Sequence, residues 1–410
     1  MRLGRPSPPD PLSHEGRGGE RWGVGSARAH AIALGVLAAL ASCAPLTHSA
    51  PVPRAAPGES LVYITNESAD QVTRLRYSAA GLVVEREYRV GINPFELEGP
   101  HGIALTPDGR WALVSIAHGT PNGTLWKLDT ASGAVPARSS LGLFPATVDV
   151  TPDGRYAFVS NFNLHGDPVP SSVSKVELAS MREVARTPTC VMPHGSRISP
   201  DGRRHYSVCM MNDELVEIDV ASARISRRFS LAPGAERPLA LEAPAAAQSG
   251  HAEHGGHAAQ GASAAAVCSP TWAQPSADGK SVFVACNRSN EILEIDVERW
   301  ALARRMAAGA APYNLAVTPD GKYLLATLKN RTEPALEVYN LAAGRSVARL
   351  PASGVLPHGV AASRDGHHAF MTVEGVGSEP GRVDVFDLAA MRRVASAEVA
   401  PQAAGVAAGR

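Results

Sequence analysis

The chain has 410 residues, 44% of them hydrophobic, and its 39 basic residues balance its 39 acidic ones. This balance removes the simplest electrostatic argument for binding nucleic acid or an anionic membrane face, and we expect no nucleic-acid partner. The length allows two or three ordinary domains, but propellers and barrels of this size also fold as one domain.

Residues 1–43 are predicted to be an export signal. An Arg-containing polar stretch precedes the apolar run AIALGVLAALAS, which is too short to span a bilayer comfortably. Residues 40–43, LASC, resemble a bacterial lipobox, which makes Cys43 the expected lipidation site and 44–59 a flexible tether. The protein is then a periplasm-facing lipoprotein, assigned to the outer membrane and held by a lipid anchor. The alternative is a cleaved signal with a chance cysteine, which leaves a secreted periplasmic protein.

A repeat occupies the remainder of the chain. Six Asp-Gly turns each have a proline nine residues before the glycine, and successive glycines are 42 to 48 residues apart except for one interval of 77. Internal periodicity of this kind indicates a repeat architecture. The glycines are Gly109, Gly154, Gly202, Gly279, Gly321 and Gly366, and the prolines are Pro100, Pro145, Pro193, Pro270, Pro312 and Pro357.

Each repeat contains four runs typical of short antiparallel strands. An apolar run such as LAVT leads through a Pro-Asp-Gly turn into a second run such as YLLAT, followed by an alternating run such as EILEIDV and an Arg-rich one such as ARISRRFSL. Proline presets φ for the turn, and glycine takes the left-handed position that closes the hairpin. Four such strands with this period predict a propeller blade.

The two ends of the repeat region predict how the ring closes. Residues 61–90 resemble the last three strands of a blade that lacks its first, and Pro401 in PQAAGVAAGR has the spacing of an inner strand. The C-terminal strand is therefore expected to complete the N-terminal blade. We predict an all-β, seven-bladed propeller over residues 60–410, with four antiparallel strands per blade, a His-rich insert at about 234–266, and a monomeric state.

Two segments, YITNESADQVTRLR and FVACNRSNEILEID, carry a family resemblance. They resemble the YVTN repeat of bacterial seven-bladed propellers, a group similar in shape to the haem propeller of nitrite reductase and the copper propeller of nitrous oxide reductase. The resemblance implies the fold and leaves the function open, because propellers host binding, lactone hydrolysis and redox chemistry.

Blade topology sorts the histidines by face. The residue after each repeat proline lies at the rim of the central channel, on the face opposite the Asp-Gly hairpins. His205, His367 and His368 lie by the hairpins, whereas eight of the eleven histidines beyond the tether map to the rim face. Those eight are His101, His118, His165, His194, His251, His254, His257 and His358.

The rim histidines suggest a binding site. Because neutral imidazole is the commonest ligand for transition metals, we hypothesise that His101, His194 and His358 form a metal or anion site, with copper or zinc as the candidate metals. Glu96 and Glu98 would orient His101. The insert, with His251, His254 and His257, would be a flexible lid or loading loop, and His118 and His165 are further candidate ligands.

A packing role is the alternative for these histidines. Each rim histidine can donate a ring N–H to a carbonyl of the neighbouring blade, and the His-Ala-Gly tract has the composition of a solvated linker. In either case the mouth is where a small ligand or a protein partner is expected to bind.

Four cysteines follow the export signal. Cys190 and Cys268 precede their repeat prolines, and Cys209 and Cys286 occupy equivalent second-strand positions. An oxidising compartment favours disulfides within the two blades, Cys190 with Cys209 and Cys268 with Cys286, over four free thiol ligands.

Three classes of function fit these features. The first is a non-catalytic, membrane-tethered protein that binds ligands or handles metal through the His-rich mouth. The second is an enzyme, either a copper redox propeller or a lactonase-like hydrolase. However, the rim has only three histidines, and no C-x-x-C-H sequence for covalent haem or G-x-S-x-G elbow occurs. The third is a protein-interaction scaffold.

Overall fold

The computed structural model describes residues 51–93, 95–119, 122–241 and 266–409. The predicted export signal with Cys43, and the insert histidines His251, His254 and His257, lie outside these residues. The described part contains 29 strands and one short 3-10 turn, η1 (Glu67–Ala69), so within it no helix is long and apolar enough to cross a membrane.

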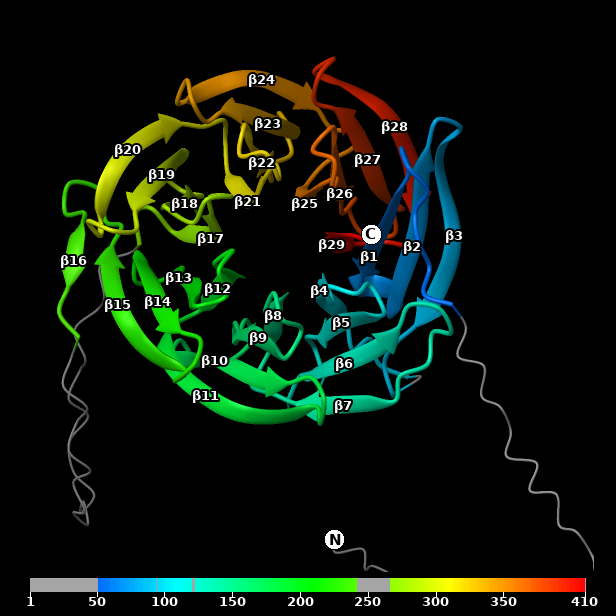
Figure 1. The fold of residues 1–410 in the computed structure, drawn as a ribbon, viewed down its shortest axis with the longest axis horizontal. Helices are drawn as coiled ribbons and strands as arrows, with labels where there is room; N and C mark the ends of the chain where they lie inside the picture. Colours follow the sequence, from blue (N-terminus) through cyan, green and yellow to red (C-terminus); the bar gives the residue numbers. More distant parts are fainter. Residues whose placement is uncertain (1–50, 94, 120–121, 242–265, 410) are drawn as a thin grey trace, which may run out of the picture. The chain divides into compact units, whose positions relative to one another are not determined.

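The strands form seven antiparallel sheets arranged as a ring (Figure 1), which confirms the predicted seven-bladed propeller. Blade 1 contains β29 (Ala403–Ala408), β1 (Ser60–Asn66), β2 (Gln71–Ser78) and β3 (Gly81–Arg89). Blade 2 contains β4 (Pro100–Leu105), β5 (Trp111–Ile116), β6 (Thr124–Asp129) and β7 (Ala137–Ser140). Blade 3 contains β8 (Pro145–Val150), β9 (Tyr156–Asn161), β10 (Pro170–Glu177) and β11 (Arg182–Val191).

Blade 4 has one strand more than predicted, because the short β16 at the start of the insert adds to its outer edge. It contains β12 (Pro193–Ile198), β13 (Arg204–Cys209), β14 (Glu214–Asp219), β15 (Arg224–Ser230) and β16 (Arg237–Leu239). Blade 5 contains β17 (Pro270–Pro275), β18 (Ser281–Cys286), β19 (Glu291–Asp296) and β20 (Ala301–Ala307). Blade 6 contains β21 (Pro312–Val317), β22 (Tyr323–Leu328), β23 (Ala335–Asn340) and β24 (Arg345–Pro351). Blade 7 contains β25 (Pro357–Ala362), β26 (His368–Val373), β27 (Gly381–Asp387) and β28 (Arg392–Val399).

The ring closes as the sequence predicted. Strand β29 pairs antiparallel with β1, with Tyr63 opposite Ala407, and becomes the inner strand of blade 1 (Figure 1). Apolar side chains fill every junction between blades; at the first, Tyr63 and Val72 of blade 1 pack against Val114 of blade 2. Before β1, Ala55 of the predicted tether packs on this same cluster, so this part of the tether contacts the propeller.

The six hairpins repeat one local arrangement. At the first turn the Thr106 hydroxyl donates to Asp108 Oδ1 at 2.6 Å, and the same carboxylate oxygen accepts the Arg110 backbone N–H at 3.0 Å. Gly109 then takes a φ of +73°, which a side chain would strain. The aspartates of these turns are therefore occupied by their own hairpins.

Hydroxyl side chains on second strands tie neighbouring inner strands together. The buried Thr372 of β26 accepts the Gly359 N–H at 2.8 Å and donates to the Ala404 carbonyl at 2.6 Å, which connects blade 7 to β29. Thr65 of β1 similarly accepts the N–H of Gly405 and donates to the His101 carbonyl, both at 2.8 Å. These bridges supply partners for polar backbone atoms that would otherwise be buried at the channel wall.

The glycine of each Pro-His-Gly triplet is required by the same close approach. A Cβ on Gly102 would lie 2.4 Å from the Ala146 carbonyl oxygen, and one on Gly195 would lie 2.2 Å from that of Thr271. A Cβ on Gly359 would lie 2.6 Å from the Ala404 oxygen. The proline and the glycine therefore serve the blade junction, whereas the histidine between them is not needed for it.

Both cysteine pairs form disulfides in the expected pairing, with S–S distances of 2.03 Å for Cys190–Cys209 and 2.06 Å for Cys268–Cys286. The second lies within blade 5, as expected. The first does not lie within one blade. Cys190 belongs to β11 of blade 3 and Cys209 to β13 of blade 4, because the outer strand of blade 3 extends to Val191, farther than the sequence suggested.

Replacing Thr372 by valine tests the hydroxyl bridges. Valine keeps the shape but leaves the Gly359 N–H and the Ala404 carbonyl unpaired, so we expect the free energy of unfolding to fall by about 1–3 kcal/mol. Equilibrium urea denaturation measures this change. Thr332→Val, at an exposed loop position, is the control. Equal stability of the two variants would show that the bridges contribute nothing.

Candidate functional site at the histidine-rich channel mouth

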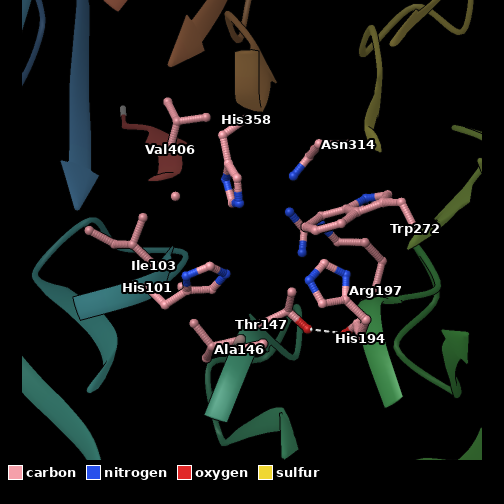
Figure 2. Close-up of a pocket in the computed structure, with 13 residues that line it drawn as sticks. His101, Ile103, Ala146, Thr147, His194, Arg197, Trp272, Asn314, His358 and Val406 are labelled. Atoms are coloured by element: carbon pink, nitrogen blue, oxygen red, sulfur yellow. Dashed lines mark hydrogen bonds between the residues drawn. The ribbon is translucent and has the colours of Figure 1, made fainter. Parts of the chain in front are cut away.

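The three predicted rim histidines occupy the second position of three inner strands and are buried: His101 on β4, His194 on β12 and His358 on β25. All three line one small cavity of about 30 Å³ in the channel (Figure 2). The structure thus brings them around one space, but each ring has different partners.

His194 uses both of its ring nitrogens. Its Nδ1 donates to the Thr271 carbonyl at 2.7 Å, and its Nε2 lies 3.1 Å from the Tyr313 hydroxyl, which donates to it. Burial lowers the pKa of His194 to about 3, so the ring is neutral. No lone pair of His194 is available to a ligand in this arrangement, which is the packing role considered as the alternative.

His358 has almost no polar partners. In the part of the chain that the structure describes, neither ring nitrogen has a hydrogen-bond partner. Nε2 lies 3.7 Å from Glu374 Oε1, and that oxygen accepts a hydrogen bond from Lys329 Nζ at 2.7 Å. Burial, and then the charge of Lys329, hold the pKa of His358 well below its ordinary value, despite a weak contact with the carbonyl of Ala404. His358 is therefore neutral and has unused hydrogen-bonding capacity.

His101 and His118 share one carboxylate, that of Glu67 in η1. Glu67 Oε2 lies 2.9 Å from His101 Nδ1, and Glu67 Oε1 lies 2.6 Å from His118 Nε2. Burial raises the pKa of Glu67, but the charges and hydrogen bonds of the two histidines outweigh it and lower this pKa to about 2. Glu67 is therefore a buried carboxylate that fixes which ring nitrogen of each histidine carries hydrogen.

A second histidine lies against His118 on its other side. His165 Nε2 is 3.2 Å from His118 Nδ1, the nitrogen that Glu67 leaves open. The ring of Phe144 packs edge-on to His118, His165 and His101, with centroid distances of 4.8, 5.5 and 5.5 Å. Phe144 has a left-handed backbone with φ of 47°, which is uncommon for an aromatic residue.

The carboxylate partner of His101 differs from the predicted one. Glu98 Oε1 accepts the Asn93 backbone N–H, and Glu96 is exposed, whereas Glu67 contacts His101. Glu67 escaped the sequence analysis because blade 1 has no Asp-Gly turn from which to count. Glu67 directly follows β1, the second strand of blade 1, and second strands end on the mouth face. That position is the signal that would have found it.

The candidate metal ligands are the histidines of the mouth and the four cysteines of the propeller. Among the residues that the structure describes, no set of three or more His, Cys, Asp or Glu side chains is arranged to hold a metal ion. The four chain cysteines of the propeller are in disulfides. Copper or zinc binding at the rim thus stays a prediction.

The ring of blades and its channel define the chain as a seven-bladed β-propeller. No protein-family model matches it, and no curated protein matches it in sequence. Its fold is similar to that of the periplasmic gluconolactonase PpgL of Pseudomonas aeruginosa, with a TM-score of 0.63 and 19% identity over 86% of this chain and 99% of that chain.

Two further solved structures show the same likeness. Hydrazine synthase of Kuenenia stuttgartiensis has a TM-score of 0.58 and 20% identity over 77% of this chain and 92% of that chain. A functionally unknown protein of Desulfotomaculum acetoxidans DSM 771 has a TM-score of 0.64 and 14% identity over 85% of this chain and 99% of that chain. At such identities the likeness shows the fold alone.

Buried neutral histidines predict the acid sensitivity of the fold. His205, stacked on Phe158 between blades 3 and 4, has its pKa lowered by burial, and secondarily by Arg197, from 6.5 to about 3. The unfolded chain binds a proton near pH 6.5 and the folded chain only near pH 3. This contribution to stability is therefore present above pH 6.5 and is lost as the pH falls.

We expect each such histidine to reduce the free energy of unfolding by about 2 kcal/mol between pH 7 and pH 5. In urea denaturation measured from pH 7 to pH 5, His205→Phe should lose about 2 kcal/mol less of its free energy of unfolding than the wild type does. His367→Gln, at an exposed hairpin position, should follow the wild type. Parallel curves for His205→Phe and the wild type would contradict the assignment.

Proposed function

We propose that this propeller is an exported binding protein of the bacterial cell envelope that holds a divalent transition-metal ion, copper(II) or zinc, at its histidine-rich mouth. The observation that carries the proposal is the arrangement Glu67–His118–His165. A carboxylate takes one nitrogen of His118, and the other nitrogen faces a second imidazole at 3.2 Å.

This arrangement has the chemistry of a metal-binding pair. Metal-ligating histidines commonly donate their second ring N–H to a carboxylate, which fixes the tautomer and raises the basicity of the ligating nitrogen. Glu67 meets that description for His118, and its low pKa keeps it ionised at neutral pH. A cation between His118 Nδ1 and His165 Nε2 would replace their mutual contact with two bonds to the metal.

The proposed ligands differ from the rim triad of the sequence hypothesis. Both ring nitrogens of His194 are bound by Thr271 and Tyr313. His118 and His165 lie farther out on the same face, where His118 is partly exposed and His165 is exposed. Two imidazoles are fewer than the three or four protein ligands of usual zinc sites. The proposal therefore retains the insert histidines, His251, His254 and His257, as the source of further ligands.

Metal titration of the full chain tests the site. We expect copper(II) or zinc to bind with 1:1 stoichiometry in isothermal titration calorimetry, and His118→Ala with His165→Ala to abolish that binding. Glu67→Gln should weaken it by about 10- to 100-fold, because the amide no longer fixes the His118 tautomer as an anion does.

Two control variants separate this site from incidental affinity. Replacing His251, His254 and His257 by alanine should weaken the bound metal without removing it, and His367→Ala should change nothing. If the insert variant loses all binding while the His118 and His165 variant keeps it, the metal belongs to the histidine tract and the proposal fails.

Membrane tethering belongs to the same proposal and rests on residues 40–43 of the sequence. Cys43→Ser should move the protein from the membrane fraction to the soluble fraction of the cell envelope. A two-chain lipid anchor holds a protein to membranes stably, so we expect nearly complete redistribution. Fractionation with immunoblotting measures it, and an unchanged distribution of Cys43→Ser would exclude a lipid anchor at that residue.

A further inference from the structure

The channel has a second opening, at the hairpin end. There a cavity of about 520 Å³ is lined by small aliphatic residues of the inner strands, among them Ala316, Val317 and Ala361, and by the polar residues Arg197, Gln274, Ser363 and Arg364. This volume falls in the range of small-molecule sites.

Arg197 of β12 stands between this cavity and the smaller one beneath the rim, because it lines both. Its guanidinium lies over the Trp272 ring, 4.4 Å from the ring centroid, and reaches into the space among the rim histidines (Figure 2). A guanidinium has five N–H donors. Within the described residues Nη1 of Arg197 donates to the Ser196 carbonyl at 2.9 Å, which leaves other N–H groups of the guanidinium for a ligand.

Several polar atoms around the smaller cavity have no hydrogen-bond partner among the described residues. Asn314 Oδ1, Trp272 Nε1 and both ring nitrogens of His358 are buried and make no hydrogen bond with the described residues, and all three residues line that cavity. Their side chains surround it in Figure 2. Buried polar groups are nearly always paired in folded proteins, and this cavity of about 30 Å³ has room for a partner about the size of one water molecule.

The charges around Arg197 select the kind of ligand. Asp149 is the nearby acid, and its Oδ1 and Oδ2 accept the backbone N–H groups of Val150 and Ile198. No ion pair within 4.0 Å joins it to Arg197 in the described part, although its charge opposes the effect of burial on the pKa of Arg197. Arg197 and Arg364 both line the larger cavity, so its charged side chains are cationic and favour an anionic ligand.

Three consecutive blades carry these groups at one level of the channel. Asp149, Arg197 and Gln274 each stand four residues after the repeat proline of their blade. The carboxylates of the hairpins do not compete for Arg197, because they accept hydroxyl and backbone N–H groups of their own turns, as Asp365 does from Ser363 and His367.

We propose that the hairpin end of the channel binds a small organic monocarboxylate. The carboxylate accepts hydrogen bonds from the Arg197 guanidinium, and the apolar body lies against the aliphatic walls of the larger cavity. Charge-assisted pairing of a guanidinium with a carboxylate is among the stronger polar contacts in proteins. The site is separate from the proposed metal site at the opposite mouth and does not depend on it.

Calorimetric titration of the full chain with propionate, butyrate and inorganic phosphate tests the proposal. We expect the monocarboxylates to bind, butyrate more tightly than propionate because it buries more apolar surface, and phosphate to bind more weakly than either. Arg197→Gln should weaken butyrate binding by at least about tenfold. His118→Ala should leave it unchanged, which separates this site from the metal site.

A second variant keeps the test decisive if Arg197→Gln does not fold. Gln274→Glu is nearly isosteric, and it adds a negative charge that repels the ligand and pairs with Arg197, so we expect a comparable loss of butyrate affinity. Arg203→Gln, at an exposed hairpin position, is the matched control and should bind as the wild type does. Circular dichroism checks the fold of each variant.

Three results would overturn the proposal. The first is no binding of either carboxylate to the wild type at millimolar concentration. The second is butyrate affinity that Gln274→Glu leaves unchanged. The third is tighter binding of phosphate than of butyrate with the same dependence on Arg197, which would assign the site to a phosphate-bearing ligand instead.

Discussion

The structure depends on how closely the inner strands of neighbouring blades approach one another. Backbone carbonyls of one strand lie where a Cβ of the next would be, so glycine follows the rim residue at Gly102, Gly195 and Gly359. Hydroxyls such as Thr372 then bind the exposed N–H of one blade and the carbonyl of the next. These contacts hold neighbouring inner strands close together, and the inner strands carry the rim histidines and Arg197.

The sequence predicts most of the fold because its signals are local and repeated. A proline nine residues before each Asp-Gly turn marks the inner strand and its hairpin, and the unpaired strand after Pro401 indicates the closure. What the sequence could not predict depends on contacts between blades. The Cys190–Cys209 bond crosses a junction, and Glu67 reaches His101 from a different blade, so neither relation appears in the spacing within a repeat.

The two mouths of the channel differ in chemistry because different positions of the inner strands lie at each. Rim positions follow the repeat proline directly, and three of them are buried histidines. His194 makes hydrogen bonds with Thr271 and Tyr313, whereas His358 makes none with the described residues. The level of Arg197 lies deeper along the same strands. A histidine count therefore located the rim face, but the unpartnered groups below it became visible only when seven strands were placed around one axis.

Closure through β29 also affects the order in which the protein acquires its structure. Blade 1 combines β1, β2 and β3 with β29, which follows all the other blades in the chain, so its inner edge stays open and the cluster between blades 7 and 1 stays incomplete until β29 has been made. The junction between blades 7 and 1 is therefore the last of the seven to form, and the ring exists only once β29 has paired with β1.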